Sequence, residues 1–371
     1  MVSRIVWHLV SNRWNSAVTE FAISAARALE GLGYQNIISP KNQSPAHNLA
    51  LRHGFLVKPL EDFKFKRVPR LLKLKQDIKP DILIVYGWHE TFLSKFLMSR
   101  EVKIFRFRGH EGGPLKRGML DQWAQRWAHS HVTGLVAPSY ISQRAWSKLT
   151  PSRPMVPITL GKDTGRYRYC RLKVLERPRL MILGRLDPIK GHRHFLQIFR
   201  LLLNNWDPSL PKPQLEIVGE EQNISYAELE GWVCNAGLKS GDDVILTKGR
   251  VPLEGVFERA SLGVICSLGS EFICRVGEEF LLSGTPIVVS GVGSLEDLLF
   301  EGAGVTYRGL SIDDSAQLVA HCLKVSMFEG EEARKKRARR AEDRFSLGVM
   351  GQSLHSFICV ARHEEFSEIE G

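Results

Sequence analysis

Two pairs of charged residues in the second half of the chain have the types and spacing needed to bind a phosphorylated sugar. Arg185 and Lys190 lie in the stretch M-I-L-G-R-L-D-P-I-K-G-H, residues 181–192. A planar guanidinium and a compact ammonium group together suit a diphosphate. Glu271 and Glu279 lie eight residues apart in S-E-F-I-C-R-V-G-E-E-F-L-L-S-G-T-P, residues 270–286. A carboxylate can accept two hydroxyl hydrogen bonds at once, as a sugar or ribose diol requires.

Each of these residues also has an ordinary structural interpretation. Arg185 and Lys190 could be two surface cations near a loop. Glu271 could be a first-turn acid that the helix dipole favours. Glu278 is expected to be a solvent-exposed helix residue. We favour binding roles for Glu271 and Glu279, because the apolar residues around them indicate a buried strand-and-helix unit.

The elements that must position these residues can be read from the pattern of the chain. Short β-branched runs alternate with helical patterns, which predicts parallel sheets with helices on both faces. A polar and basic segment, residues 160–178, separates two such blocks. Ligands of open parallel sheets bind beyond the carboxyl ends of the strands, so we expect the four charged residues there. The predicted strands are RIVWHLV, QNIIS, DILIVYG, KIFRF, GLVAPS and PITLG in the first block, and RLMILG, QLEIVG, DVILTKG, LGVICS, TPIVVSG and GVTYR in the second.

Two predicted helices begin beside the charged residues. Asp187 and Pro188 form a good N-cap and first-turn pair after the strand that ends at Gly184. A second helix is predicted to begin near Cys274 or Arg275. Backbone N–H groups and the macrodipole favour anions at both helix starts.

Composition narrows the class of protein. The chain has 371 residues, of which 43% are hydrophobic and 25% charged, as in a globular protein of two ordinary domains. Its six cysteines form no C-x-x-C pair, which indicates a reducing compartment, and we expect a cytoplasmic protein. The net charge of +11 fits nucleic acid, anionic lipid or a phosphorylated substrate. Charges of alternating sign at residues 329–344 predict a solvated helix face.

The order of the motifs resembles that of the nucleotide-sugar glycosyltransferases of the GT-B fold, specifically glycosyltransferase family 4, also called group 1. The two glutamates match the E-x7-E pattern of that family, and Gly284-Thr285-Pro286 falls at its G-x-P. I-T-L-G-K-D, which ends at Asp163, resembles its interdomain loop, and A-E-D-R-F-S-L-G resembles the start of its closing helices. The resemblance covers most of residues 155–360, and several motifs in order at family spacing are more specific than any single one.

The resemblance implies an α/β fold with two Rossmann-like doubly wound domains that face each other across a cleft. Residues 1–162 would form the acceptor-side domain, together with a carboxy-terminal helix, residues 347–371, that crosses back to it. Residues 163–346 would form the domain that binds the nucleotide sugar.

The resemblance also implies a role for each matching residue. Arg185 and Lys190 would neutralise the diphosphate, and Glu279 would hold the ribose hydroxyls. Glu271 would hold the transferred sugar and its phosphate, together with the N–H groups of Phe272, Ile273 and Cys274. Arg275 could extend toward a phosphate or an acidic acceptor. The base would lie against the segment formed by Lys248, Gly249, Arg250 and Val251. Such enzymes usually retain anomeric configuration and need no metal or other cofactor, and the chain has no D-x-D motif.

Residues of the amino-terminal domain are expected to contact the acceptor and the donor sugar. Arg13 and Trp14 replace the usual paired glycines of the first loop and are interpreted as acceptor contacts. Arg106 and Arg108 share one face of a strand and would reach the cleft on the acceptor side. His110 matches roughly a family histidine that touches the donor sugar, and the alternative is an ordinary loop histidine.

The sequence therefore predicts a retaining, metal-independent transferase that moves a sugar from a nucleotide-diphosphate donor to a hydroxyl acceptor. The basic excess suits an anionic or membrane-borne glycan or glycolipid, such as growing lipopolysaccharide, with peripheral contact at the membrane surface. An epimerase or phosphorylase of the same fold is one alternative. A non-catalytic binding module is another, although no nucleic-acid motif supports nucleic acid as its partner.

Overall fold

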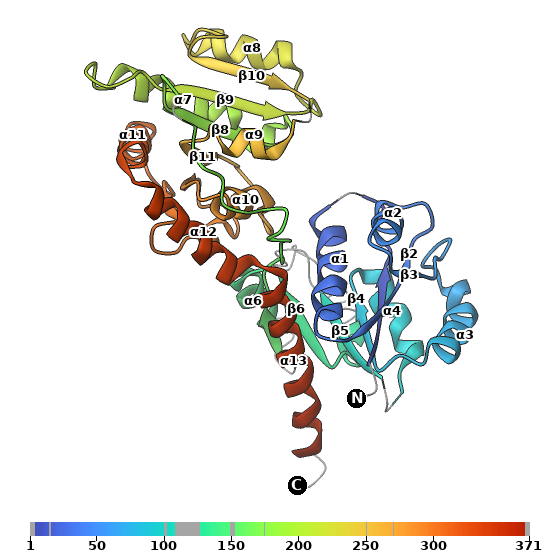
Figure 1. The fold of residues 1–371 in the computed structure, drawn as a ribbon. Helices are drawn as coiled ribbons and strands as arrows, with labels where there is room; N and C mark the ends of the chain where they lie inside the picture. Colours follow the sequence, from blue (N-terminus) through green and yellow to red (C-terminus); the bar gives the residue numbers. More distant parts are fainter. Residues whose placement is uncertain are drawn as a thin grey trace. The chain divides into compact units, whose positions relative to one another are not determined.

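The computed structural model describes residues 4–14, 16–99, 102–107, 127–148, 153–173, 175–249, 251–269 and 271–367. The chain divides into two compact units (Figure 1). Unit 1 comprises residues 1–163 and 344–371, and unit 2 comprises residues 164–343.

Unit 1 is built on a seven-stranded parallel sheet of order β3-β2-β1-β4-β5-β6-β7. The chain order reverses between β1 and β4, which makes the carboxyl ends of these two strands the topological switch point. The strands are β1 (Ile5–Val10), β2 (Gln35–Pro40), β3 (Leu56–Val57), β4 (Ile82–Val85), β5 (Lys103–Phe107), β6 (Gly134–Ala137) and β7 (Met155–Pro157). The helices are α1 (Ala17–Glu30), α2 (Pro45–Arg52), α3 (Val68–Ile78), α4 (Trp88–Ser94), α6 (Tyr140–Ser147) and α13 (Leu347–Ser367), with short 3-10 helices η1 (Phe65–Arg67) and η2 (Lys95–Leu97).

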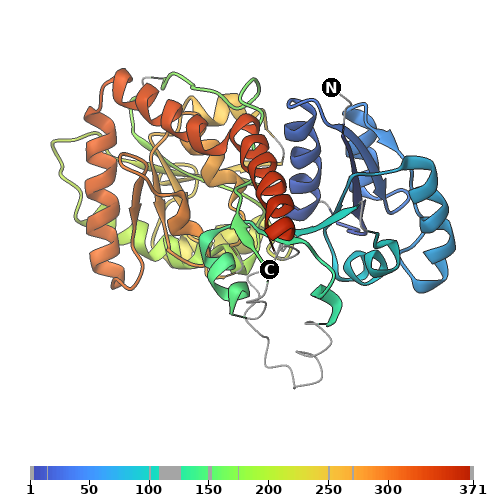
Figure 2. The same cartoon turned by 90° about the horizontal axis from the view of Figure 1, so that it is seen from below.

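The carboxy-terminal helix α13 returns to unit 1 after the whole of unit 2 and packs on α1 (Figure 2). A Cβ atom on Gly351 would lie 2.6 Å from the carbonyl oxygen of Ala28, so glycine is what permits this close approach. The hydroxyl of Tyr34 and Nδ1 of His355 are 2.8 Å apart and add a polar contact. The predicted return of the last helix to the amino-terminal domain is confirmed.

Unit 2 holds a six-stranded parallel sheet of order β10-β9-β8-β11-β12-β13. Here the chain order reverses between β8 and β11. The strands are β8 (Arg179–Leu183), β9 (Gln214–Gly219), β10 (Val244–Lys248), β11 (Leu262–Ile265), β12 (Ile287–Val289) and β13 (Gly304–Thr306). The helices are α7 (His192–Asn204), α8 (Tyr226–Asn235), α9 (Leu253–Phe257), α10 (Arg275–Leu282), α11 (Ile312–Phe328) and α12 (Glu331–Phe345), with 3-10 helices η3 (Pro188–Lys190) and η4 (Leu295–Leu298).

Both sheets are flanked by helices, so the predicted α/β class with two Rossmann-like domains is confirmed. The core of unit 2 lies between β8, β9, β11 and helices α7, α8 and α11, with Phe195 and Phe199 fully buried. None of the helices that the structure describes is long and apolar enough to span a bilayer.

Two predictions about the surface are wrong. Residues 329–344 do form helix α12 over most of their length, but their charges do not all face solvent, because Arg334 and Arg337 are buried. Both guanidinium groups lie near Glu329, with an Arg337–Glu329 ion pair at 2.6 Å. Glu278 was expected on the helix surface and is also buried.

Candidate functional site

The loops after β8 and β11 meet at the switch point of unit 2. Strands β8 and β11 are hydrogen-bonded neighbours, so the two segments that follow them leave the same edge of the sheet side by side. Arg185 and Lys190 follow β8, and Glu271 follows β11. The topology therefore brings together two motifs that lie about eighty residues apart in the sequence.

The loop after β8 is fixed by its own polar contacts. Asp187 caps η3 by accepting a hydrogen bond from the backbone N–H of Ile189 at 3.1 Å. The amide of Asn223 donates to the other carboxylate oxygen of Asp187 at 2.8 Å. The predicted N-cap role of Asp187 thus holds for η3, and α7 begins after it at His192.

Gly191 anchors this loop against the end of β11. Its φ of 74° lies in the left-handed region, and a Cβ atom there would lie 2.0 Å from the carbonyl oxygen of Cys266. The backbone N–H of Leu268 donates to the carbonyl of Ile189 at 2.8 Å, and the thiol of Cys266 donates to the carbonyl of Lys190 at 3.1 Å. These contacts fix the backbone from which the Lys190 side chain extends.

Lys190 and Glu271 form a short ion pair between Nζ and Oε1. The hydroxyl of Ser267 donates to the same carboxylate oxygen at 2.5 Å. The backbone N–H and hydroxyl of Ser294 both donate to the carbonyl of Glu271, at 2.8 and 3.0 Å. Glu271 is only 4% exposed, whereas the side chain of Lys190 is about one-third exposed. The pair is thus a buried, fixed acid joined to a cation that reaches solvent.

Arg185 lies in the same loop with more freedom than Lys190. Its side chain is half-exposed, and its closest acidic partner is Asp187, with Nε and Oδ2 3.8 Å apart. The neighbouring Gly184 lies very close to the end of the paired strand β9, because a Cβ atom on Gly219 would lie 1.9 Å from the Gly184 carbonyl oxygen. His192 adds no positive charge at neutral pH, since burial lowers its pKa to about 4.

Helix α10 begins four residues after Glu271 and carries Glu279. Cys274 is its N-cap residue and offers no side-chain capping bond, so the first backbone N–H groups of the helix have no cap from that side chain. Burial raises the pKa of the Cys274 thiol, which is therefore a neutral, packed side chain at neutral pH. Phe272, Ile273 and Arg275 lie in or beside this turn and are half-buried.

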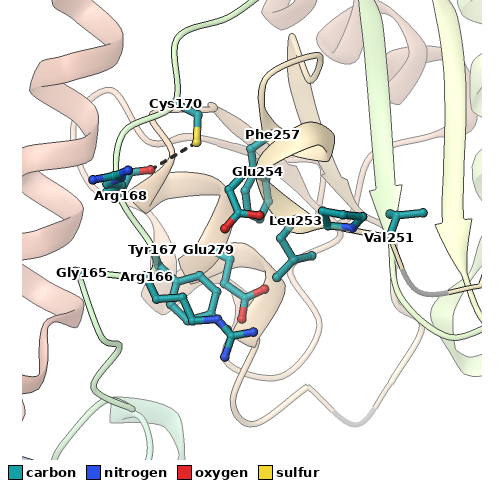
Figure 3. A pocket seen from close by; sticks show the side chains of 11 residues that line it. Gly165, Arg166, Tyr167, Arg168, Cys170, Val251, Leu253, Glu254, Phe257 and Glu279 are labelled. Atoms are coloured by element: carbon teal, nitrogen blue, oxygen red, sulfur yellow. Dashed lines mark hydrogen bonds between the residues drawn. The ribbon is translucent and has the colours of Figure 1, made fainter.

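A cavity of about 260 Å³ opens beside Glu279 within unit 2 (Figure 3). One wall is the segment after the unit boundary, with Arg166 and Tyr167, and the opposite wall is Val251 and Leu253. The guanidinium of Arg166 lies 5.4 Å from the centre of the Tyr167 ring. Glu279 and Glu254 contribute carboxylates, and the remaining lining residues are Gly165, Arg168, Cys170, Pro252 and Phe257.

The predicted base-binding segment is divided in the structure. Val251 lines the cavity, but Lys248 lies over the ring of Tyr226, with Nζ 5.0 Å from its centre. The N–H of Gly249 donates to the Tyr226 hydroxyl at 2.9 Å. Arg250 lies outside the described residues.

The predicted residues of unit 1 differ in their exposure. Arg13 and Trp14 follow β1 and are exposed, Trp14 to 75%. Arg106 is buried at the end of β5, where it donates to the carbonyl of Gly87 and lies near Glu90. Its side chain is therefore not presented to solvent. Arg108 and His110 lie outside the residues that the structure describes.

Some site residues had no signal in the sequence. Ser267 and Ser294 hold Glu271, yet isolated serines are too common to single out. Arg166 and Tyr167 belong to a segment that the pattern identified only as a hinge. Across the described part of the chain, no three His, Cys, Asp or Glu residues are grouped so as to hold a metal ion. The expectation that the reaction needs no metal remains a prediction.

Comparison with known proteins identifies a family domain in unit 2 and solved structures of the same fold. Residues 177–326 match the family described as glycosyl transferases group 1. No curated protein sequence matches the chain. Among solved structures, a glycosyltransferase from Rickettsia africae ESF-5 aligns with a TM-score of 0.78 and 13% identity, over 97% of this chain and 99% of that one.

Two further structures are similar over nearly the whole chain. Anabaena Alr3699/HepE in complex with UDP has a TM-score of 0.76 and 14% identity, with 96% of this chain and 100% of that one covered. The lipopolysaccharide outer core galactosyltransferase WaaB in its apo form has a TM-score of 0.72 and 12% identity, with 96% and 99% covered. At such low identity these likenesses establish the GT-B fold.

Proposed function

We propose that this chain, a glycosyltransferase of the GT-B fold with a group 1 domain at residues 177–326, transfers a sugar from a nucleotide-diphosphate donor to a hydroxyl acceptor, with retention and without a metal. The observation that carries the proposal is the Lys190–Glu271 pair at the switch point of unit 2. Glu279, about one turn into the helix that follows Glu271, lines a cavity of the same unit. A cation in contact with an acid, and a second acid on the helix that begins four residues after the first, correspond to the parts of a sugar linked through a diphosphate to a nucleoside.

The nucleoside is proposed to occupy the cavity of unit 2. Glu279 would accept hydrogen bonds from the two ribose hydroxyls, since a carboxylate offers two acceptor oxygens. The base would lie between Val251 and Tyr167, an apolar and an aromatic wall. HepE binds UDP in the structure named above, so uridine is the first base to test.

The diphosphate is proposed to lie at the amino end of α10. Glu279 is the fifth residue of that helix, so a ribose beside it places the diphosphate about 6 Å away at the helix start. There the backbone N–H groups of the helix start, Lys190 and Arg185 would face it. Because Lys190 is held by Glu271 in the free protein, it is already positioned before the donor arrives.

The bond changes follow from these positions. The bond between the anomeric carbon and the phosphate oxygen breaks, and its electron pair stays on the diphosphate. The acceptor oxygen then forms the new bond on the same face, and its proton passes to the departing phosphate oxygen. Arg185, Lys190 and the helix dipole stabilise the charge that develops on that oxygen. Glu271 would orient the sugar hydroxyls throughout.

The acceptor is proposed to be a glycan or glycolipid of the cell envelope, such as growing lipopolysaccharide. The excess of basic residues supports an anionic acceptor at a membrane surface. Arg13 and Trp14 are exposed after β1, beside the switch point of unit 1, and could contact it. WaaB, which shares the fold, is named as a lipopolysaccharide galactosyltransferase.

Calorimetric titration with UDP, GDP and ADP tests the donor site. One of them should bind, and Arg185→Ala should weaken its affinity about tenfold or more, because a hydrogen bond to a charged group is lost. Arg177→Ala is a matched control, since this arginine pairs with Asp242 and belongs neither to the cavity nor to the switch point. Failure of all three nucleotides to bind, or equal affinity in both variants, would contradict the proposal.

A further inference from the structure

Exposed apolar side chains gather on one side of unit 1. Phe65 is 63% exposed and Met98 51%, and Leu72, Phe96 and Trp127 are each about two-fifths exposed. Single exposed apolar residues are ordinary on soluble proteins, but a connected group of this kind marks an interaction surface. We call these five residues the aromatic patch.

Ring contacts connect the aromatic patch across separate segments of the chain. The rings of Phe65 in η1 and Phe96 in η2 meet edge to face, with centroids 5.3 Å apart. Phe92 in α4 links Phe96, at 5.9 Å, to Trp127, at 5.7 Å. The rings therefore join three segments of the chain, and Leu72 and Met98 belong to two of these segments. Figure 1 shows α3 and α4 near each other on the same side of unit 1.

Cations lie next to the aromatic patch. The segment K-F-K-R-V-P-R-L-L-K-L-K-Q-D-I-K, residues 64–79, contains seven basic residues and one acid. Lys66 and Arg67 are paired with Asp62. Lys64, beside Phe65, and Lys73, beside Leu72, are exposed and form no ion pair with another described residue.

A lysine also lies beside an exposed aromatic ring at Trp127. The ammonium group of Lys95 lies 3.6 Å from the centre of the indole ring. Lysine stems can lie along apolar surface while their charged ends reach a polar layer, which suits an interface between hydrocarbon and phosphate. Protein–protein interfaces, in contrast, are depleted of lysine at their cores.

We infer that the aromatic patch and its flanking lysines dock unit 1 on a bilayer that contains anionic lipids. Phe65, Phe96 and Met98 would enter the boundary between headgroups and acyl chains, and Lys64 and Lys73 would contact lipid phosphates. The inference rests on the surface of unit 1 alone, so it does not depend on the proposed donor. The GT-B fold by itself does not specify a membrane surface as the partner of unit 1.

Vesicle flotation of the full chain tests this inference. The protein should float with vesicles of equal parts phosphatidylcholine and phosphatidylglycerol, and about tenfold less with phosphatidylcholine alone. Binding should weaken as salt is raised, since the charges are screened. Equal binding to both vesicles, or no binding to either, would overturn the inference.

Two pairs of variants assign the binding to this surface. Lys64→Glu with Lys73→Glu should lower flotation about tenfold or more, whereas Lys336→Glu with Arg339→Glu, an equal charge change on exposed residues of α12, should lower it much less. Phe65→Ser should also lower it, in contrast to Phe328→Ser on α11, where the phenylalanine is 72% exposed. If the control variants lose as much binding as the patch variants, net charge alone explains it and the patch has no role.

Nucleotide titration of the same variants separates this inference from the proposed function. The patch variants should keep the nucleotide affinity of the original chain, because Lys64, Lys73 and Phe65 belong to unit 1 and the donor cavity is lined by unit 2. Loss of flotation with unchanged nucleotide binding would support the docking surface even if no transfer is found. Because Phe65, Lys64 and Lys73 are exposed, their variants should fold normally. Loss of both flotation and nucleotide binding would show that the variants are misfolded and would contradict this expectation.

Discussion

Oε1 of Glu271 accepts hydrogen bonds from both the ammonium group of Lys190 and the hydroxyl of Ser267, so one oxygen atom joins the loops after β8 and β11. The residue that would bind the sugar therefore also holds the cation that would bind the diphosphate. Replacing either residue removes a ligand contact and frees the other residue to move.

Lys190→Ala is expected to reduce both activity and stability. Loss of a fixed cation at the developing phosphate charge should lower kcat about 10²- to 10³-fold. Among the described residues, Ser267 alone would then donate to the buried Glu271 carboxylate, and the free energy of unfolding should fall by about 1–3 kcal/mol. Donor hydrolysis and urea unfolding measure the two effects. Lys336→Ala, an exposed lysine of α12, is the control, and an unchanged kcat in Lys190→Ala would exclude the assigned role.

Adjacent acids on α10 provide a second comparison. Glu279 lines the cavity, whereas Glu278 is buried but is absent from its lining. Glu279→Gln should weaken UDP binding about tenfold, because hydrogen bonds from the ribose to a charged acceptor are lost. Glu278→Gln should leave the affinity nearly unchanged.

The 2′-deoxy analogue of UDP makes this comparison specific for the ribose. The original chain should bind UDP more tightly than the analogue, and Glu279→Gln should discriminate between them much less. Calorimetry gives both affinities. An undiminished preference for UDP in Glu279→Gln would show that another group holds the 2′-hydroxyl.

Local sequence pattern was sufficient to predict the alternation of strands and helices. Buried strands such as β1 and β9 are β-branched or apolar runs bounded by polar residues, and α10 begins where the pattern placed it. The predicted strand PITLG, residues 157–161, is wrong over most of its length, because β7 is Met155–Pro157. Beyond Ile158 the segment pairs with the chain around Phe345, and Lys162 accepts and donates backbone bonds there. A partner almost two hundred residues away leaves no local signal.

The sequence pattern also failed to predict which charged side chains are buried. Periodicity cannot distinguish an exposed arginine from a buried one, so Arg334 and Arg337 appeared to belong to a solvated face. Arg106 was singled out as an unusual charge in a strand, and its contacts, Gly87 and Glu90, are the N-cap residue and a first-turn residue of α4. For the site, residue types and spacing predicted Lys190 and Glu271, and only the topology shows their contact.

Stability should fall as the pH drops below 6.5, owing to buried histidines. Burial lowers the pKa of His8 to about 4, so the unfolded chain binds its proton first, and the folded state loses stability between pH 6.5 and 4. Burial raises the pKa of Glu90, and its contribution has the opposite sign. In His8→Gln the loss of unfolding free energy between pH 7 and 5 should be smaller by about 2 kcal/mol.

Urea unfolding at pH 7 and pH 5 measures this difference. His192, whose pKa is also lowered to about 4, provides an independent case in unit 2, and His192→Gln should change the pH dependence in the same direction. Identical pH dependence in His8→Gln and the original chain would mean that His8 does not resist protonation in the folded state.

Gly191→Ala is expected to disrupt the site through the backbone alone. Gly191 and Gly309 have the same φ of 74°, so alanine at either position should cost about 1 kcal/mol of conformational strain. At Gly309 a Cβ atom would have open space, whereas at Gly191 it would lie 2.0 Å from the Cys266 carbonyl oxygen. Gly191→Ala must therefore push the loop away from β11 and separate Lys190 from Glu271. Urea unfolding should show a clearly larger loss for Gly191→Ala than for Gly309→Ala, and only the former should weaken nucleotide binding. Equal losses in the two variants would mean that contact with β11 does not position Lys190.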